Sequence, residues 1–305
     1  MLLRDRSPAK TAARPALRRH RWYVPLVFVG PVLILQGTFL FTPLVNTFVL
    51  SFTDASTVGG GQFVGLDNFA TLAGDAGFWA AVGRTFLYML CTVPVIVTLS
   101  TSLAILVNTS LRGSAVIRSL LFSPMVMPLA TVAVMFQFVL RSDGLVNQVL
   151  GGLHVISRPL PFLSSSNLAL VSLMLVTVWK GCALATLISL AALQNVSGEL
   201  DEAARIDGAG WLRRTWSVTL PQIRGTTVLV GVLTSISVLR IFTEPYVMTG
   251  GGPGGSTETI VLYLFEQGVS PGTQAGYASA ISLALFVFVL AAAAVTWIVT
   301  RGRRA

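Results

Sequence analysis

Charged side chains are scarce in this sequence. Asp, Glu, Lys and Arg make up only 11% of its 305 residues, whereas a soluble domain carries about 25%. Hydrophobic residues make up 53%, and the mean hydropathy is +0.76. Several long stretches contain no charge, and about 20 apolar residues are enough to cross a bilayer as a helix. The composition therefore excludes an ordinary soluble domain and predicts an all-α integral membrane protein.

Cysteine and histidine are also rare. Cys91 and Cys182 both fall inside hydrophobic stretches, so we predict neither a disulfide framework nor a metal site. His20 and His154 are far apart in the sequence and lie in polar segments. A membrane enzyme needs a nucleophile, a base or a metal constellation near one interface. These residues do not supply one, so we expect no catalytic residues.

Lysine is limited to Lys10 and Lys180, and the sequence contains no GxxxxGK[ST] phosphate-binding loop. The glycine-rich run 250–255 lacks the required lysine and has no Walker-like context. We therefore read this run as a flexible loop, with a purely structural turn as the alternative, and expect the chain to bind no cofactor of its own. Any energy from nucleotide hydrolysis would have to come from another chain.

Carboxylates are almost absent from the hydrophobic stretches, Glu244 being marginal. An ion-coupled secondary transporter would need an acid or an acid–base relay inside the membrane, and often an internal repeat. No repeat is visible in the sequence. A secondary transporter is kept as the alternative to the function developed below.

Six hydrophobic stretches are long enough to cross a membrane. A basic segment precedes the first stretch, but the stretch is too long for the core of a signal peptide, so we expect an uncleaved span. The spans would form a permease domain, 23–300, between the tails 1–22 and 301–305. A short interfacial helix is expected at Phe78–Gly83. We place the spans at 24–52, 86–107, 119–140, 168–193, 225–243 and 276–300.

Basic residues alternate along the polar segments. Seven of the 21 lie in positions 1–22, and arginines recur at 108–118 and 194–224, whereas 53–83 and 245–275 contain none. Lys and Arg mark the cytoplasmic side of a membrane protein. Both termini and residues 194–224 are therefore predicted to be cytoplasmic. The net charge of +9 belongs to the flanks of spans and does not indicate nucleic-acid binding.

The cytoplasmic loop at 195–224 has a patterned sequence. Glu202-Ala203-Ala204 is followed by Gly208, and ten residues later by Val218-Thr219-Leu220-Pro221. This pattern resembles the EAA loop of ABC-importer permeases, which reads EAA, three residues, Gly, nine residues, Ile-x-Leu-Pro. Val218 stands where the family usually has Ile. The resemblance implies that the following residues couple the chain to its ATPase: Glu202, Ala203, Ala204, Asp207, Gly208, Ala209, Leu220 and Pro221.

The same loop reads as two short helices joined at a turn. Ser197 is a plausible N-cap, and Asp201 and Arg205 stand at i, i+4, where they can pair. Gly208 suits a left-handed break between the helices, and Pro221 is expected to close the segment before the fifth span. The alternative is an amphipathic loop resting on the membrane surface. The full motif in register on the predicted inner face favours the coupling role.

The resemblance extends beyond this loop to the maltose- and glycerol-3-phosphate-type permeases of carbohydrate ABC importers, over most of the chain. Segments 63–69, 123–128, 249–253 and 256–259 resemble that family. It implies a type I ABC-importer permease fold with cytoplasmic coupling helices, as a multi-pass protein of the bacterial plasma (inner) membrane.

The resemblance also implies a set of partners. They are a second, non-identical permease, two copies of an ABC ATPase subunit that hold ATP and Mg, and an extracytoplasmic solute-binding protein. The solute-binding protein is expected to contact the external loop through Gly250, Gly251, Gly252 and Pro253.

Charges within the spans are candidates for the translocation path. A cation such as Lys180 at the membrane centre costs about 2.5–3.5 kcal/mol, so it should face a partner or a wet cavity. Arg240 and Glu244 stand at i, i+4. With Trp179, these residues are expected to bind solute hydroxyls or an anionic head group. The alternatives are a structural Arg240–Glu244 pair and a contact of Lys180 with carbonyls or a partner carboxylate. Sugars, oligosaccharides and glycerophosphate-type solutes all remain open.

Overall fold

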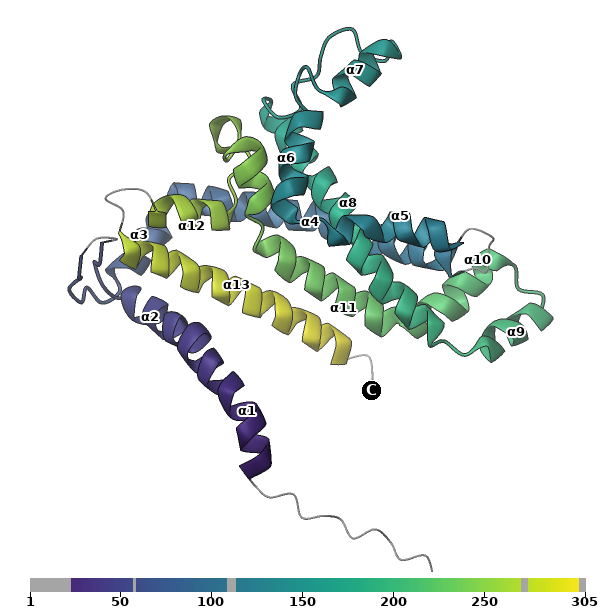
Figure 1. Cartoon of the computed structure of the whole chain (residues 1–305), viewed down its shortest axis with the longest axis horizontal. Helices are drawn as coiled ribbons and strands as arrows, with labels where there is room; N and C mark the ends of the chain where they lie inside the picture. The colour runs from purple at the N-terminus through teal and green to yellow at the C-terminus, as the bar shows by residue number, and fades with distance from the viewer. Residues whose placement is uncertain (1–22, 57–58, 109–113, 270–273, 302–305) are drawn as a thin grey trace, which may run out of the picture. The chain divides into compact units, whose positions relative to one another are not determined.

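A computed structural model describes residues 23–56, 59–108, 114–269 and 274–301 (Figure 1). The predicted basic tail, 1–22, lies outside the described residues. Helices dominate the described part, where only isolated β-bridges such as Thr53 with Phe63 interrupt them. The chain divides into two compact units, 1–46 and 47–305. The all-helical architecture confirms the predicted fold class.

The first unit contains α1 (Tyr23–Gln36) and a π-helical turn, Gly37–Phe41, after which α2 (Thr42–Leu50) begins. The hydroxyl of Thr42 donates to the carbonyl of Gly37 at 3.1 Å. Residues Leu26–Leu50 form a helical stretch long and apolar enough to span a bilayer.

The second unit contains four further helices of sufficient length and apolarity: Ala76–Val107, which is α4, Ser166–Gln194, which is α8, Trp211–Leu239, and Ala275–Ala294 within α13 (Ala275–Arg301). The first, second and last correspond to predicted spans, although α4 begins ten residues before position 86. The third starts at Trp211 rather than at 225 and ends at Leu239 rather than at 243, because the helix continues through part of the predicted loop.

The predicted span at 119–140 is not one straight helix. It consists of α5 (Ser114–Val126) and α6 (Leu129–Val139), and the axes of Val116–Val126 and Leu129–Val139 are bent by 101°. Pro128 stands at the break with φ −57° and ψ 136°, an extended conformation. Proline has no N–H and disfavours helical geometry in the residue before it. The described helices therefore give five spans, or six if this pair is one broken span.

Helix α4 packs against α8 and against α11 (Leu220–Leu239). Fully buried residues at their contacts include Tyr88 and Leu173. Gly181 allows a close approach, since a Cβ there would lie 3.0 Å from Cδ1 of Ile96. Small residues at helix contacts let membrane helices pack tightly. These helices form the frame around the candidate site.

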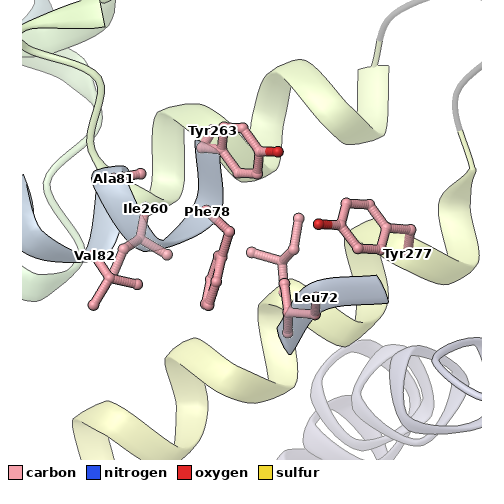
Figure 2. Close-up of a cluster of buried hydrophobic side chains, with 8 residues drawn as sticks. Leu72, Phe78, Ala81, Val82, Ile260, Tyr263 and Tyr277 are labelled. Atoms are coloured by element: carbon pink, nitrogen blue, oxygen red, sulfur yellow. The ribbon is translucent and has the colours of Figure 1, made fainter. Parts of the chain in front are cut away.

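A second cluster joins the start of α4 to α3 (Asp67–Gly74), α12 (Ile260–Val269) and α13. The expected interfacial helix at Phe78–Gly83 is wrong, because these residues form the first turns of α4 and Phe78 is buried in the cluster. Figure 2 shows the hydroxyl groups of Tyr263 and Tyr277 pointing toward each other beside it.

Both tyrosine hydroxyls donate to Oδ2 of Asp75, which caps α4, and the Tyr263 bond is 2.5 Å long. The carboxylate also accepts from the backbone N–H of Gly77 at 2.8 Å. Burial disfavours the charge, but the hydrogen bonds from Tyr263, Tyr277 and the backbone outweigh it and lower the pKa of Asp75. A charged carboxylate therefore links helices that are distant in the sequence.

Candidate functional site

The first part of the loop predicted to be cytoplasmic, 195–224, is α9 (Gly198–Ile206). Ser197 is its N-cap, and its hydroxyl accepts a hydrogen bond from the N–H of Glu199 at 3.3 Å, as predicted. Glu199 and Asp201 lie in the first turn. Carboxylates there favour the positive end of the helix dipole. The sequence therefore specifies where this helix begins.

The helix ends in a tight left-handed turn. Gly208 has φ +74°, which confirms the predicted break. Its N–H donates to the carbonyl of Arg205 at 3.0 Å, and the N–H of Ala209 donates to the carbonyl of Ala204 at 2.9 Å. These two bonds form a Schellman motif, which satisfies the last carbonyls of the helix. Ala203 and Ala204 of the EAA segment thus lie in the final turns.

The surface around this turn is exposed and includes two small residues. Glu202, Ala203, Asp207 and Gly208 are exposed, and nothing lies within 4 Å of a Cβ built on Gly208. Ile206 on the same helix is 86% exposed, and its apolar side chain was not singled out from the sequence. A protein partner can cover an exposed isoleucine, since burial of its apolar side chain stabilises a complex.

Asp201 connects the two helical parts of the loop. The predicted pair with Arg205 is present, with 3.7 Å between Oδ2 and Nε. A second pair joins Oδ1 of Asp201 to Nε of Arg214 at 3.3 Å, and the Arg214 side chain is only 15% exposed. Arg214 was missed because it is 13 residues from Asp201 and on another helix. No helical spacing rule relates the two positions.

The second helical part runs directly into the apolar helix α11. α10 (Trp211–Arg214) continues through a π-helical turn, Thr215–Thr219, into α11. Pro221 therefore does not close the segment, and this expectation is wrong. It stands in the first turn of α11, where a missing N–H is tolerated, and the preceding N–H of Leu220 donates to Thr215 across the wider turn.

Two adjoining cavities lie at the bent helix pair. The first, of about 280 Å³, is lined by Met125 and Leu129 on either side of the bend and by Lys180 from α8. The second, of about 290 Å³, is lined by Arg240. Three of the four predicted path residues, Lys180, Arg240 and Glu244, therefore lie around these adjoining cavities, and Glu244 lines both. The cavities share these lining residues: Leu129, Thr177, Ser237, Val238 and Glu244.

Lys180 is held by backbone carbonyls. Its ammonium donates to the carbonyl of Met127 at 2.6 Å and to that of Pro124 at 3.1 Å. Of the alternatives, the contact with carbonyls is the one present, and the carbonyls belong to the broken span of the same chain. Trp179 packs its ring against Phe136, with centroids 5.3 Å apart, and does not line either cavity.

Arg240 and Glu244 do not form the expected helical pair. The helix ends at Leu239, and among the described residues neither side chain makes an ion pair with the other. Glu244 is 4% exposed, and its Oε1 accepts from the hydroxyl of Thr177 at 3.1 Å. Its Oε2 has no hydrogen-bond partner in the described part of the chain. Thr177 is one helical turn from Lys180, a spacing from which it could have been found.

The glycine-rich segment forms a hydrogen-bonded turn. Gly250, Gly251 and Gly252 have φ of +57°, +88° and +78°. The N–H of Thr257 donates to the carbonyl of Gly251 at 2.8 Å, and a Cβ on Gly252 would lie 2.6 Å from Oγ1 of Thr257. Pro253 begins a short 3₁₀ turn. Only glycine fits such a turn without strain.

The charges beside this segment form one ion pair. Nη1 of Arg84 lies 3.1 Å from Oε2 of Glu258 and donates to the Glu258 carbonyl at 3.0 Å. Burial and the nearby carboxylate of Glu258 raise the pKa of Glu266. Among the described residues no group of three or more His, Cys, Asp or Glu is placed to hold a metal ion.

Residues 69–304 match the family described as binding-protein-dependent transport system inner membrane component. The chain is 32% identical to the sulfoquinovosyl glycerol transport system permease protein of Agrobacterium fabrum, over 88% of each chain. It is 34% identical to the trehalose/maltose transport system permease protein of Thermococcus litoralis, over 91% of this chain and 94% of that protein.

A solved structure shares the fold. It is a crystal structure of a bacterial ABC transporter involved in the import of the acidic polysaccharide alginate, and one of its chains matches with a TM-score of 0.78 at 20% identity, over 91% of this chain and 96% of that chain. The fold is thus that of a type I ABC-importer permease. The chain belongs to the family of binding-protein-dependent transport system inner membrane components, the permease subunits of ABC importers.

Proposed function

We propose that this chain forms half of the translocation path of an ATP-driven importer and receives the work of ATP hydrolysis through α9. The observation that carries the proposal is the cytoplasmic loop. Its EAA residues lie on an exposed helix, which ends at Ile206 before the turn at Gly208, and an ion pair between Asp201 and Arg214 joins it to the span-forming helix. Movement of α9 by a partner would therefore be transmitted to Trp211–Leu239.

The proposed solute is a sugar or a glycerophosphate-type compound. The relatives from Agrobacterium and Thermococcus are permeases for sulfoquinovosyl glycerol and for trehalose and maltose. The cavities bring hydroxyl, carboxylate and cationic side chains to one space, namely Ser237, Glu244, Lys180 and Arg240. Such a set can hydrogen-bond the hydroxyl groups of a sugar, and its cations can also attract an anionic head group.

The proposed assembly has two permeases of different sequence, two ATPase subunits that bind ATP and Mg, and a solute-binding protein outside the membrane. The ATPase would bind the exposed turn around Glu202 and Gly208, and the binding protein would dock at Gly250–Pro253. We propose a multi-pass position in the bacterial inner membrane with both termini in the cytoplasm, and the basic flanks of the spans support this orientation.

Alternating access would follow from these contacts. Loaded binding protein docks outside, and closure of the ATPase dimer on ATP moves α9 and the spans so that the cavity opens outward. ATP hydrolysis then returns the spans to the inward-open arrangement.

The test is ATPase stimulation in the reconstituted complex. The purified chain, its second permease, the ATPase and the binding protein would be assembled in proteoliposomes and exposed to a panel of disaccharides, oligosaccharides and glycerophosphate compounds. We expect at least one of these solutes, with its binding protein, to stimulate ATP hydrolysis. If none of the solutes in the panel changes the ATPase rate of the complex, the proposed solute class is contradicted.

A further inference from the structure

The break between α5 and α6 leaves a backbone carbonyl without its helical partner. In an α-helix the carbonyl of Pro124 would accept from the N–H of residue 128. Residue 128 is proline and has no N–H. Pro124 is buried, and a buried carbonyl without a donor costs about 1–3 kcal/mol. The break therefore needs a donor from elsewhere in the fold.

Lys180 supplies that donor across 56 residues of sequence. Its ammonium bonds the carbonyl of Pro124 at 3.1 Å and that of Met127, the residue before the proline, at 2.6 Å. The cation is itself costly inside a membrane unless polar groups surround it. The ammonium is therefore solvated by the Pro124 carbonyl, which the proline has left without a donor, and by the Met127 carbonyl at the break.

The same bend shapes the wall of the cavity. Met125 lies before the break and Leu129 after it, and both line the cavity together with Lys180. A change in the bend would move these two side chains relative to each other. The Lys180 ammonium therefore contacts the break between α5 and α6, and Lys180 also lines the cavity.

We infer that Lys180 is a positioning residue that holds the third span in its bent form and thereby sets the shape of the cavity. It acts through the carbonyls of Pro124 and Met127 rather than as the principal contact of the solute. Its importance for uptake rests on the proposed function, whereas its hold on the bend does not.

The bend can be measured by the distance between two spin labels. Leu120 on α5 and Phe138 on α6 are 69% and 58% exposed, which makes both suitable for Leu120→Cys and Phe138→Cys labelling. Cys91 and Cys182 would be replaced in this background. With a rise of 1.5 Å per residue, the two Cα atoms would be about 27 Å apart in a straight helix and about 10 Å closer at the 101° bend.

Lys180→Met keeps an unbranched side chain that is one atom shorter, and it removes the hydrogen-bond donors. We expect the label distance in nanodiscs to broaden and lengthen by several ångströms in this variant, and to stay at its original value in Lys180→Arg, which keeps donors. If Lys180→Met fails to insert, Lys180→Gln carries the same expectation, because it cannot reach both carbonyls. Thr234→Val is the matched control, since Thr234 lines the same cavity away from the break.

An unchanged distance in Lys180→Met or Lys180→Gln would overturn the inference, whatever happens to uptake. A lengthened distance in Thr234→Val as well would also overturn it, because any cavity change would then relax the bend. A bend that responds to Lys180 in a complex that imports none of the solute panel would count against the proposed function alone.

Discussion

Arg214 and Asp201 form an ion pair of 3.3 Å between α9 and the helix that begins at Trp211. Asp201 also meets Arg205 at 3.7 Å, but that pair stays within α9. Only the first pair can carry a displacement from one helix to the other. Because both residues are partly exposed, the pair contributes no more than about 1 kcal/mol to stability. Its effect is therefore expected in the coupling of the two helices rather than in folding.

Replacing Arg214 separates these effects. We expect Arg214→Ala to raise the ATP hydrolysed per solute imported, because α9 would move without displacing the span. Arg205→Ala removes the other partner of Asp201 and should leave the ratio unchanged. Both would be measured in proteoliposomes as ATPase rate against uptake of labelled solute. Equal ratios in the two variants would rule out a coupling role for the Arg214 pair.

The turn at Gly208 is sensitive to side-chain shape. Its φ of +74° costs about 1–2 kcal/mol for an ordinary L-residue, and bulk there would block a partner from the exposed face. Gly208→Trp should insert normally but lose coupling of uptake to ATP hydrolysis. Gly208→Asn, which tolerates the left-handed region, should retain most of it. Unchanged uptake and unchanged solute-stimulated ATPase activity in Gly208→Trp would contradict the coupling role of this turn.

Asp75 should make stability depend on pH in the acid range. Its pKa is lowered in the folded protein from the ordinary value of 3.8. The charged form therefore stabilises the fold above that value, and the stabilisation is lost as pH falls through the folded pKa. We expect Asp75→Asn to lower the Tm at pH 7, with the difference from the original protein shrinking below about pH 4.

Asp67→Asn is the control for this measurement, since Asp67 also begins a helix but is exposed. Its Tm should change less than that of Asp75→Asn at neutral pH. Equal changes in the two variants would mean that the bonds from Tyr263 and Tyr277 do not stabilise the charged carboxylate.

Tyr263 gives a matching expectation at alkaline pH. Burial and the bond to Asp75 raise the pKa of its hydroxyl to about 12. The neutral hydroxyl stabilises the fold below the ordinary value of 10, and this contribution is lost as pH rises toward 12. The Tm difference between the original protein and Tyr263→Phe should therefore shrink from pH 9 to pH 12, measured by thermal unfolding in detergent. A constant difference would contradict the assignment.

The effect of a glycine substitution in segment 250–255 should depend on which glycine is replaced. A Cβ at Gly252 would collide with Oγ1 of Thr257, whereas nothing lies within 4 Å of a Cβ at Gly254, although both have positive φ. Gly252→Ala should weaken binding-protein-stimulated ATPase more than Gly254→Ala. The concentration of binding protein needed for half-maximal stimulation would report the difference. Equal half-maximal concentrations in the two variants would contradict a role for this turn in docking of the binding protein.

Local features of the site were predictable because they depend on neighbours in sequence. The cap at Ser197, the pair of Asp201 with Arg205 and the turn at Gly208 each follow from spacing within one or two helical turns. The apolar length of the spans likewise indicated most of the membrane helices.

The features that were missed join distant residues. The 101° bend depends on Pro128, which the sequence displays, but also on Lys180, which compensates the freed carbonyl from another helix. The ring of bonds around Asp75 reaches Tyr263 across 188 residues. Helix α11 ends at Leu239, so Arg240 and Glu244 do not share a helical face. No proline or glycine directly after Leu239 indicates this helix end in the sequence. Such contacts depend on the packing of helices, which local periodicity does not encode.

The most direct test of the account compares two energy sources in proteoliposomes that contain the complete complex and its binding protein. One sample receives ATP and Mg on the side of α9 with no ion gradient, and the other receives an imposed proton or sodium gradient without ATP. An importer of this family predicts solute uptake in the first sample and none in the second. Uptake driven by the gradient alone would contradict the account and favour an ion-coupled secondary transporter.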